Sequence, residues 1–178
     1  MPTQIVLLRG VNIGPRNRVA MPKLRELLEQ AGYEDVRTYV QSGNVVLTTS
    51  ERPTRLATRC KELIADGFGL DIDVIVRTWA ELAKIVERDP LGDVAKEPKR
   101  YQVTFLASRL PAGTVDRLAD LATASECFAA HGKELYAWHP AGVARSRLWA
   151  AIADRRLGVA ATSRNWTTVE ALLALAGE

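Results

Sequence analysis

The chain has 178 residues, of which 47% are hydrophobic and 25% charged, and its formal net charge is +3, which is ordinary for a soluble globular protein. Its two cysteines, Cys60 and Cys127, lie far apart and form no C-x-x-C motif, which excludes a disulfide framework and a zinc ribbon. Its apolar runs are too short for a signal peptide or for the roughly 18 residues of a membrane helix, so we expect a cytoplasmic protein with no membrane partner.

The first 78 residues alternate between apolar runs typical of strands and amphipathic periods typical of helices. In chain order they predict a strand, a helix, two strands joined by a tight turn, a second helix and a fourth strand: Gln4–Arg9, Pro22–Gly32, Asp35–Gln41, Asn44–Thr49, Pro53–Gly67 and Leu70–Arg77. This order is that of the ferredoxin-like fold, in which the helices cover one face of the sheet. We therefore expect an α+β protein whose residues 1–78 form a ferredoxin-like βαββαβ subdomain.

Residues 79–178 predict a smaller second α+β subdomain, packed on the first. Thr78 and Glu81 have the spacing of a capping box, and the charged segment Arg88–Arg100 is typical of a linker. The strands and helices expected after this linker are Tyr101–Ala107, Val115–Ala122, Glu126–Ala130, Glu134–Trp138, Arg145–Leu157 and a last helix capped by Thr167 with Glu170. The sequence shows no internal repeat.

Three polar segments interrupt the predicted strand and helix ends: Leu7–Met21, Tyr39–Leu47 and Ala161–Leu173. Much of the positive charge lies in or beside two of them, because residues 9–25 carry five basic side chains and no acid, and residues 143–167 carry five arginines and one aspartate. The remainder of the chain is net acidic. A basic patch on an acidic body favours a small anion or a nucleic-acid backbone as ligand, and the alternative is a solvated, arginine-rich face.

The first polar segment runs from a strand end into a helix N-terminus, where free N–H groups and arginine side chains bind phosphate or carboxylate. It matches neither common phosphate-loop motif. The third segment has the same character, and its tryptophan either stacks on a base or sugar or packs in the core. The middle segment is also explained by an ordinary hairpin turn. The candidate ligand-binding residues are Arg9, Asn12, Arg18, Gln41, Ser42, Asn44, Arg145, Arg164, Asn165 and Trp166.

No catalytic base, nucleophile or metal-ligand spacing is recognisable. His131 lies at a predicted hairpin tip and His139 precedes a proline, both outside the polar segments. The two cysteines fall where packing residues are expected, and Ser146 is predicted as a helix N-cap. The sequence therefore leaves open whether the protein is an enzyme, and it predicts neither a metal nor a cofactor.

The strings LLRGVNIG, YVQSGNVV and TSRNWTTVEALL, with a basic run ending at Met21, resemble in this order the bacterial domain-of-unknown-function family sixteen ninety-seven. The resemblance covers nearly the whole chain. It implies a ferredoxin-like N-terminal subdomain and a second α+β subdomain, and it implies no activity. Pro15 departs from the glycine common in such proteins, and because proline lacks an N–H, side chains would carry more of any anion binding. The pattern falls on Arg9, Gly10, Asn12, Gly14, Gln41, Ser42, Gly43, Asn44, Arg164, Asn165 and Trp166.

Together these features predict a protein that binds a small ligand bearing phosphate or carboxylate in a basic cleft lined by Asn and Arg. One alternative is binding of RNA or single-stranded nucleic acid through the basic loops. Base stacking of the RRM type is not favoured, because the predicted central strands of the first sheet have no aromatic residue. The other alternative is a structural or interaction module in which the motifs hold the subdomains together. The sequence identifies neither the ligand nor the oligomeric state.

Overall fold

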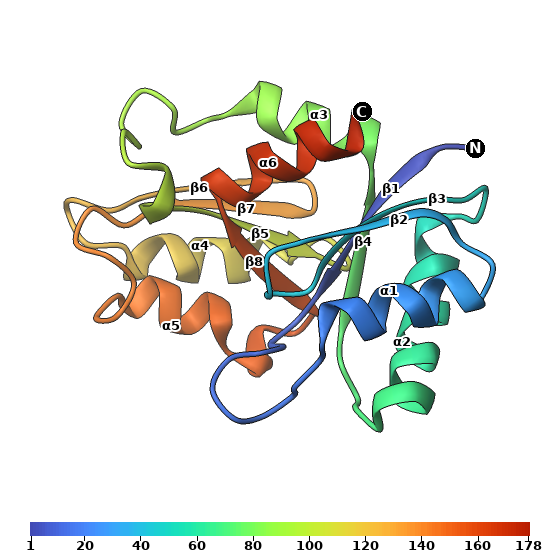
Figure 1. The fold of residues 1–178 in the computed structure, drawn as a ribbon. Helices are drawn as coiled ribbons and strands as arrows, with labels where there is room; N and C mark the ends of the chain where they lie inside the picture. Colours follow the sequence, from blue (N-terminus) through green and yellow to red (C-terminus); the bar gives the residue numbers. More distant parts are fainter. The chain divides into compact units, whose positions relative to one another are not determined.

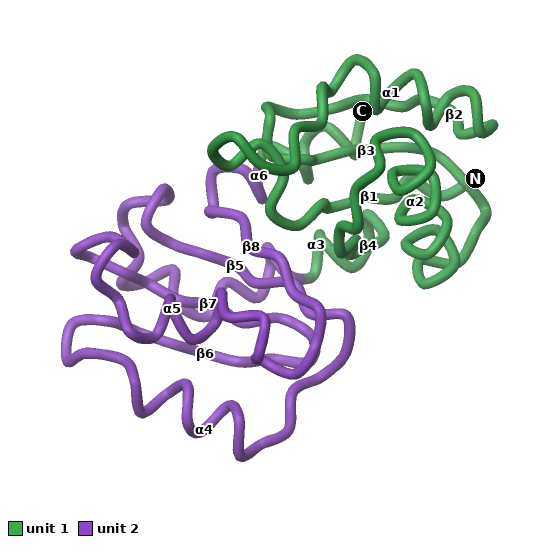
Figure 2. The backbone as a smooth tube through the Cα atoms, turned by 90° about the horizontal axis from the view of Figure 1, so that it is seen from below, with its two compact units in different colours: residues 1–84, 171–178 green, residues 85–170 purple.

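The computed structural model describes residues 1–178 and shows a mixed α+β protein with two four-stranded antiparallel sheets and six α-helices (Figure 1). The chain divides into two compact units (Figure 2): residues 1–84 with 171–178 form unit 1, and residues 85–170 form unit 2. The boundaries fall inside the helices α3 (Trp79–Arg88) and α6 (Trp166–Ala176). None of the helices combines the length and apolarity needed to span a membrane.

Unit 1 contains the predicted elements in the predicted order. They are β1 (Thr3–Leu8), α1 (Met21–Gln30), β2 (Glu34–Tyr39), β3 (Asn44–Thr48), α2 (Pro53–Phe68) and β4 (Val74–Thr78). The strands lie in the order β2-β3-β1-β4, and every neighbouring pair is antiparallel. Alternation along the strands directs one set of apolar side chains toward α1 and α2, as in Val6 and Leu8 of β1. Cys60 of α2 packs in this core, and burial raises the pKa of its thiol to about 12.

In unit 2, a short 3₁₀ helix at Pro98–Arg100 follows the end of α3. The unit continues through β5 (Tyr101–Leu106), α4 (Ala112–Leu121), β6 (Cys127–His131), β7 (Glu134–Trp138), α5 (Arg147–Ala153), a second 3₁₀ helix (Arg155–Leu157) and β8 (Ala161–Asn165). Its strands lie in the order β6-β7-β5-β8, again antiparallel. The core lies between this sheet and the helices α4 and α5, which contribute Leu118, Leu148 and Ile152.

Two sequence predictions for unit 2 were wrong in detail, and one strand was missed. The helix expected over Arg145–Leu157 is split, because Asp154 is extended and its carboxylate accepts a hydrogen bond from the N–H of Arg156 (2.8 Å). The last helix starts at Trp166, and its cap is Asn165 in place of Thr167, since the Asn165 side chain accepts a hydrogen bond from the N–H of Thr168 (3.0 Å). The strand β8, which pairs with β5, was not predicted.

The two units repeat one topology, which the sequence does not show. In each unit the chain forms a strand, a helix, a hairpin of two strands, a second helix and a fourth strand, and a further helix follows. In both sheets the first strand lies between the third and the fourth, and the second strand lies at the edge beside the third. The register is also repeated: Gln4 pairs with Thr78 in unit 1, and Gln102 pairs with Asn165 in unit 2. The helix contacts follow the same scheme, because α1 and α2 pack against β2 and β4, and α4 and α5 pack against β6 and β8.

The closing helices begin alike in the two units. Arg77-Thr78-Trp79 leads into α3, and Arg164-Asn165-Trp166 leads into α6, so that each helix starts at a tryptophan behind a polar cap. The predicted capping box of α3 is confirmed: the hydroxyl of Thr78 accepts from the N–H of Glu81 (3.1 Å), and the Glu81 carboxylate accepts from the N–H of Thr78 (2.8 Å). Because the two units share this topology, the loops of one can be compared with the equivalent loops of the other.

Candidate functional site

The loop from β1 to α1, residues 9–20, is closed by Asn12. This residue has a positive φ of 56°, which asparagine tolerates better than other side chains. Its Nδ2 donates to the carbonyl oxygens of Val19 (2.8 Å) and Gln41 (2.7 Å), and its Oδ1 accepts from the N–H of Val19 (2.9 Å). Asn12 thus holds both ends of the loop together and ties the loop to the turn between β2 and β3.

The same loop buries two anchors and exposes its tip. Val11 and Val19 are each only 1% exposed and belong to the core of unit 1, whereas Ile13 is 75% exposed. Arg16 and Arg18 are also exposed, and neither side chain forms an ion pair or a hydrogen bond within the protein. The loop therefore exposes Arg16 and Arg18, while the buried side chains of Val11 and Val19 anchor its backbone in the core.

Replacing Asn12 with alanine is expected to lower the free energy of unfolding by about 3 kcal/mol, because three hydrogen bonds are lost and alanine disfavours a positive φ. Urea denaturation followed by circular dichroism measures this loss. Asn17→Ala is the control, since Asn17 has a φ of 52° and its amide makes a single bond of 3.3 Å to the Gly10 carbonyl. Its loss should be about 1–2 kcal/mol. Equal losses would contradict the closing role of Asn12.

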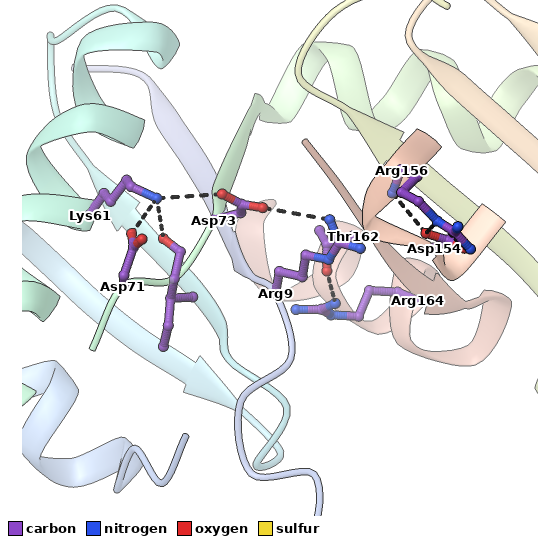
Figure 3. Close-up of polar contacts among 9 residues, drawn as sticks. Arg9, Lys61, Asp71, Asp73, Asp154, Arg156, Thr162 and Arg164 are labelled. Carbon is purple, nitrogen blue, oxygen red and sulfur yellow. Dashed lines mark hydrogen bonds and ion pairs between the residues drawn. The ribbon is translucent and has the colours of Figure 1, made fainter. Parts of the chain in front are cut away.

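Arg9 lies at the start of the loop, in a chain of charges within unit 1 (Figure 3). Its guanidinium is 3.5 Å from a carboxylate oxygen of Asp73, and its side chain is 16% exposed. Lys61 of α2 contacts carboxylate oxygens of Asp71 (2.8 Å) and Asp73 (3.4 Å). The hydrogen bond to Asp71 is the main reason that the pKa of Lys61 is raised. Because Asp73 compensates the charge of Arg9, the uncompensated cations of this loop are Arg16 and Arg18.

The turn between β2 and β3 adjoins this loop. Gln41 and Ser42 are exposed, whereas Asn44 is fully buried and its amide donates to the carbonyl of Tyr39 (3.1 Å) and the hydroxyl of Ser42 (2.9 Å). Val40 is 52% exposed and has a φ of 48°, which is a strained conformation for a β-branched residue. Asn44 therefore shapes the turn, while Gln41 and Ser42 remain accessible to a ligand.

The remaining candidates belong to unit 2. Arg164 is 7% exposed, and its guanidinium donates to the hydroxyl of Thr162 (2.7 Å; Figure 3) and to the carbonyl of Ser163 (2.9 Å). Burial lowers the pKa of Arg164 to about 10, so the side chain stays charged at neutral pH. Trp166 is 6% exposed and stacks on Tyr101 with 4.6 Å between ring centroids. Arg145 is exposed and borders a hollow of about 550 Å³ beside Ser146.

The structure thus groups six candidates in unit 1 and four in unit 2. In unit 1 it brings Asn12 into contact with Gln41, and Asn44 into contact with Ser42. In unit 2, Arg164, Asn165 and Trp166 follow one another along the end of β8 and the start of α6. The asparagines and Trp166 have partners inside their own units, and the exposed candidates are Arg18, Gln41, Ser42 and Arg145.

A family model described as "Protein of unknown function (DUF1697)" matches residues 1–136. The chain belongs to this family. A solved structure, described as that of the conserved bacterial protein SP0830 from Streptococcus pneumoniae, is similar over 98% of each chain, with a TM-score of 0.75 and 20% sequence identity. At this identity the likeness shows the fold alone. The comparison with curated proteins gave no match.

One polar cluster in this DUF1697 protein was missed by sequence reasoning. Glu126 accepts hydrogen bonds from the ring of His139 and the hydroxyl of Ser146 (2.6 Å), and Ser146 caps α5 by accepting from the N–H of Trp149 (3.0 Å), as predicted. Burial alone would raise the pKa of Glu126, but the bonds from Ser146, His139 and Thr123 outweigh burial and lower it. His139 is fully buried, and the cluster fixes the start of α5. Glu126 and Ser146 also line the hollow that Arg145 borders.

The two predicted strands could have linked Glu126 to His139, because the register that pairs Cys127 with Trp138, continued by one residue, places them opposite each other. No signal in the sequence links Ser146 to this pair. No group of three or more His, Cys, Asp or Glu side chains is placed to hold a metal ion. In the loop and the turn of unit 1, the exposed polar side chains among those considered are the guanidinium groups of Arg16 and Arg18, the amide of Gln41 and the hydroxyl of Ser42. Such groups can bind and orient a ligand by hydrogen bonds and charge.

Proposed function

We propose that the β1–α1 loop and the β2–β3 turn of unit 1 form a binding site for a small ligand that carries phosphate or carboxylate. Arg16 and Arg18 supply the positive charge, and Gln41 and Ser42 orient the ligand by hydrogen bonds. These four side chains are accessible, and Asn12 and Asn44 position the backbone that carries them.

The observation that carries this proposal is the length of the loop. Residues 9–20 connect β1 to α1, whereas residues 107–111 make the equivalent connection from β5 to α4 in unit 2. The turn of unit 1 is longer too, since residues 40–43 stand where unit 2 has only Gly132 and Lys133. The shared topology does not require these additions. Surface loops longer than the fold requires are commonly functional, and here the two additions are bonded to each other through Asn12 and Gln41.

The start of α1 adds to the attraction for an anion. Ala20 caps the helix without a side-chain hydrogen bond, and the first turn contains no acidic residue. Pro22 occupies this turn and lacks an N–H, but the N–H groups of Met21 and Lys23 remain near the loop. Helix N-termini favour negative charge, and arginine binds phosphate or carboxylate in a two-pronged geometry.

Thermal denaturation of the full chain with inorganic phosphate, citrate and nucleoside monophosphates tests this function. A ligand at about one hundred times its Kd should raise Tm by roughly 5–10 °C. The variant Arg16→Gln/Arg18→Gln should lose most of this rise. Arg25→Gln is the control, because Arg25 is an exposed arginine of α1 that pairs with Glu29. No rise with any anion, or an equal rise in the double variant, would overturn the proposal.

Nucleic acid remains the alternative ligand for the same two arginines. Base stacking on the sheets is not favoured, since β1 and β3 contain no aromatic residue. In β5 and β7, Tyr101, Phe105 and Tyr136 are buried, and Trp138 is half-buried. Contacts to a phosphate backbone weaken steeply with salt. A gel shift with single-stranded RNA that disappears between low and physiological salt, without any effect of mononucleotides, would favour this alternative.

We also infer that unit 1 is ferredoxin-like. Its element order is that of the split βαβ motif, and its strand order β2-β3-β1-β4 places the first and third strands at the centre, as this motif requires. We assign Arg164, Asn165 and Trp166 to the stability of unit 2, which is the structural alternative for these motif residues. A role of Arg145 in ligand binding stays a prediction.

A further inference from the structure

Unit 2 contains another hollow, which shares no lining residue with the sites described above. It has a volume of about 320 Å³ and lies between the β5–α4 connection, the start of α4 and the turn from β6 to β7. Its floor is apolar, with Leu106, Leu110 and Leu135 each at most 5% exposed. Three charged or titratable side chains also line it, namely Arg109, Asp116 and His131.

The repeat explains why this hollow is open. In unit 1 the N–H of Leu8 donates to the carbonyl of Gly43, and in unit 2 the N–H of Leu106 donates to the carbonyl of Lys133, both over 2.9 Å. Beside the first pair lies Val11, whose methyl group would be only 2.7 Å from a Cβ on Gly43. In unit 1 the long β1–α1 loop thus fills the space beside the end of the first strand with Val11. In unit 2 the short β5–α4 connection buries only Leu110 and leaves a hollow there.

The charges around the hollow are opposite but separate. Arg109 and Asp116 both line it, yet no nitrogen of one lies within ion-pair distance of an oxygen of the other. Arg109 and His131 are exposed, and their side chains have no hydrogen-bond partner in the protein. The start of α4 adds a site for negative charge, because Pro111 caps the helix without a side-chain hydrogen bond and Ala112 lines the hollow.

We propose that this hollow binds an aliphatic α-amino acid of about the size of leucine. The carboxylate lies at the start of α4 near Arg109, the ammonium group lies at Asp116, and the branched side chain lies on the leucine floor. The volume of about 320 Å³ lies at the lower end of the range for small-molecule sites, which suits a ligand as small as an amino acid. The pairing of an apolar floor with a few polar groups is typical of small-molecule sites.

Four probes test the parts of this proposal separately in an NMR titration of the full chain. Leucine has all three features, 4-methylpentanoate lacks the ammonium group, 3-methylbutylamine lacks the carboxylate, and glycine lacks the side chain. We expect leucine to shift the resonances of residues around the hollow, and each of the other three to bind at least tenfold more weakly. If 4-methylpentanoate or the amine binds as tightly as leucine, or if leucine does not bind, the proposal is overturned.

Two variants locate the site. Val115→Trp places a large side chain into the hollow and should abolish leucine binding, and Asp116→Asn should remove the preference for leucine over 4-methylpentanoate. Arg117→Gln, on the same helix but not lining the hollow, should bind like the wild type. Leucine binding that survives in both site variants would overturn the assignment. A separate titration of the same sample with inorganic phosphate reports on residues 9–20, so failure of one site is distinguished from failure of the other.

Discussion

Replacing Gly43 with alanine is expected to lower the free energy of unfolding by about 3–4 kcal/mol, because strain and overpacking add at this position. Gly43 has a φ of +81°, a left-handed conformation that alanine disfavours. An added Cβ would lie 2.7 Å from both the Cβ of Leu8 and a methyl group of Val11, and Leu8 cannot move its Cβ without moving strand β1. The turn, the strand end and the loop would all have to shift.

Gly10→Ala is the matched control for this prediction. Gly10 also has a positive φ, of +65°, but an added Cβ would meet no atom within 4 Å. Its loss should therefore be only about 1 kcal/mol, which is the backbone contribution alone. Urea denaturation of the two variants separates the contributions of strain and close packing. Similar losses would show that the turn and the loop are not tightly packed around Gly43.

The elements of unit 1 could be predicted because its strands are short apolar runs or alternate between apolar and polar residues, and its helices carry clear apolar stripes. Strand β8 could not, since Ala161–Asn165 is short and mostly polar. Its burial comes from pairing with β5 and from side chains such as Thr162 and Arg164 that find hydrogen bonds inside the unit. A local apolar pattern cannot reveal a strand whose polar side chains are satisfied by neighbours distant in sequence.

The repeat was also beyond sequence reasoning, because few identities remain between the units. Gln4 and Gln102 occupy equivalent positions, as do Arg77 and Arg164, but the loops differ in length and most core residues differ in type. The topology depends on the pairing of the strands and on the packing of two helices against one face of the sheet. Many combinations of apolar residues satisfy these requirements equally well. The comparison of loop lengths that supports both proposed sites therefore required the structure.

Within the polar motifs, the sequence could not separate residues that hold the backbone from residues whose side chains are accessible to a ligand. Asn12 bonds to the main chain of Val19 and Gln41, and Asn165 bonds to that of Thr168. Main-chain partners leave no trace in the sequence, since every residue type offers the same groups. Exposure and pairing, which only the structure gives, single out Arg16 and Arg18.

Replacing Trp166 with alanine is expected to lower the free energy of unfolding by about 4 kcal/mol, since buried tryptophan replaced by alanine leaves a large cavity. Trp166 is 6% exposed, and its ring is nearly parallel to that of Tyr101, with an angle of 12° between them. Such a contact adds to the stabilisation from burial. Calorimetry or urea denaturation of the full chain measures the loss.

Trp79 is the matched control, because it starts α3 at the equivalent position of the other unit and is 43% exposed. Its replacement by alanine should cost only about 1–2 kcal/mol, in proportion to the smaller apolar area that it buries. If Trp166 instead stacks on a bound base or sugar, Trp166→Ala should be no less stable than Trp79→Ala and should weaken ligand binding. A large loss of stability confined to Trp166→Ala assigns the tryptophan of the third motif to the core of unit 2.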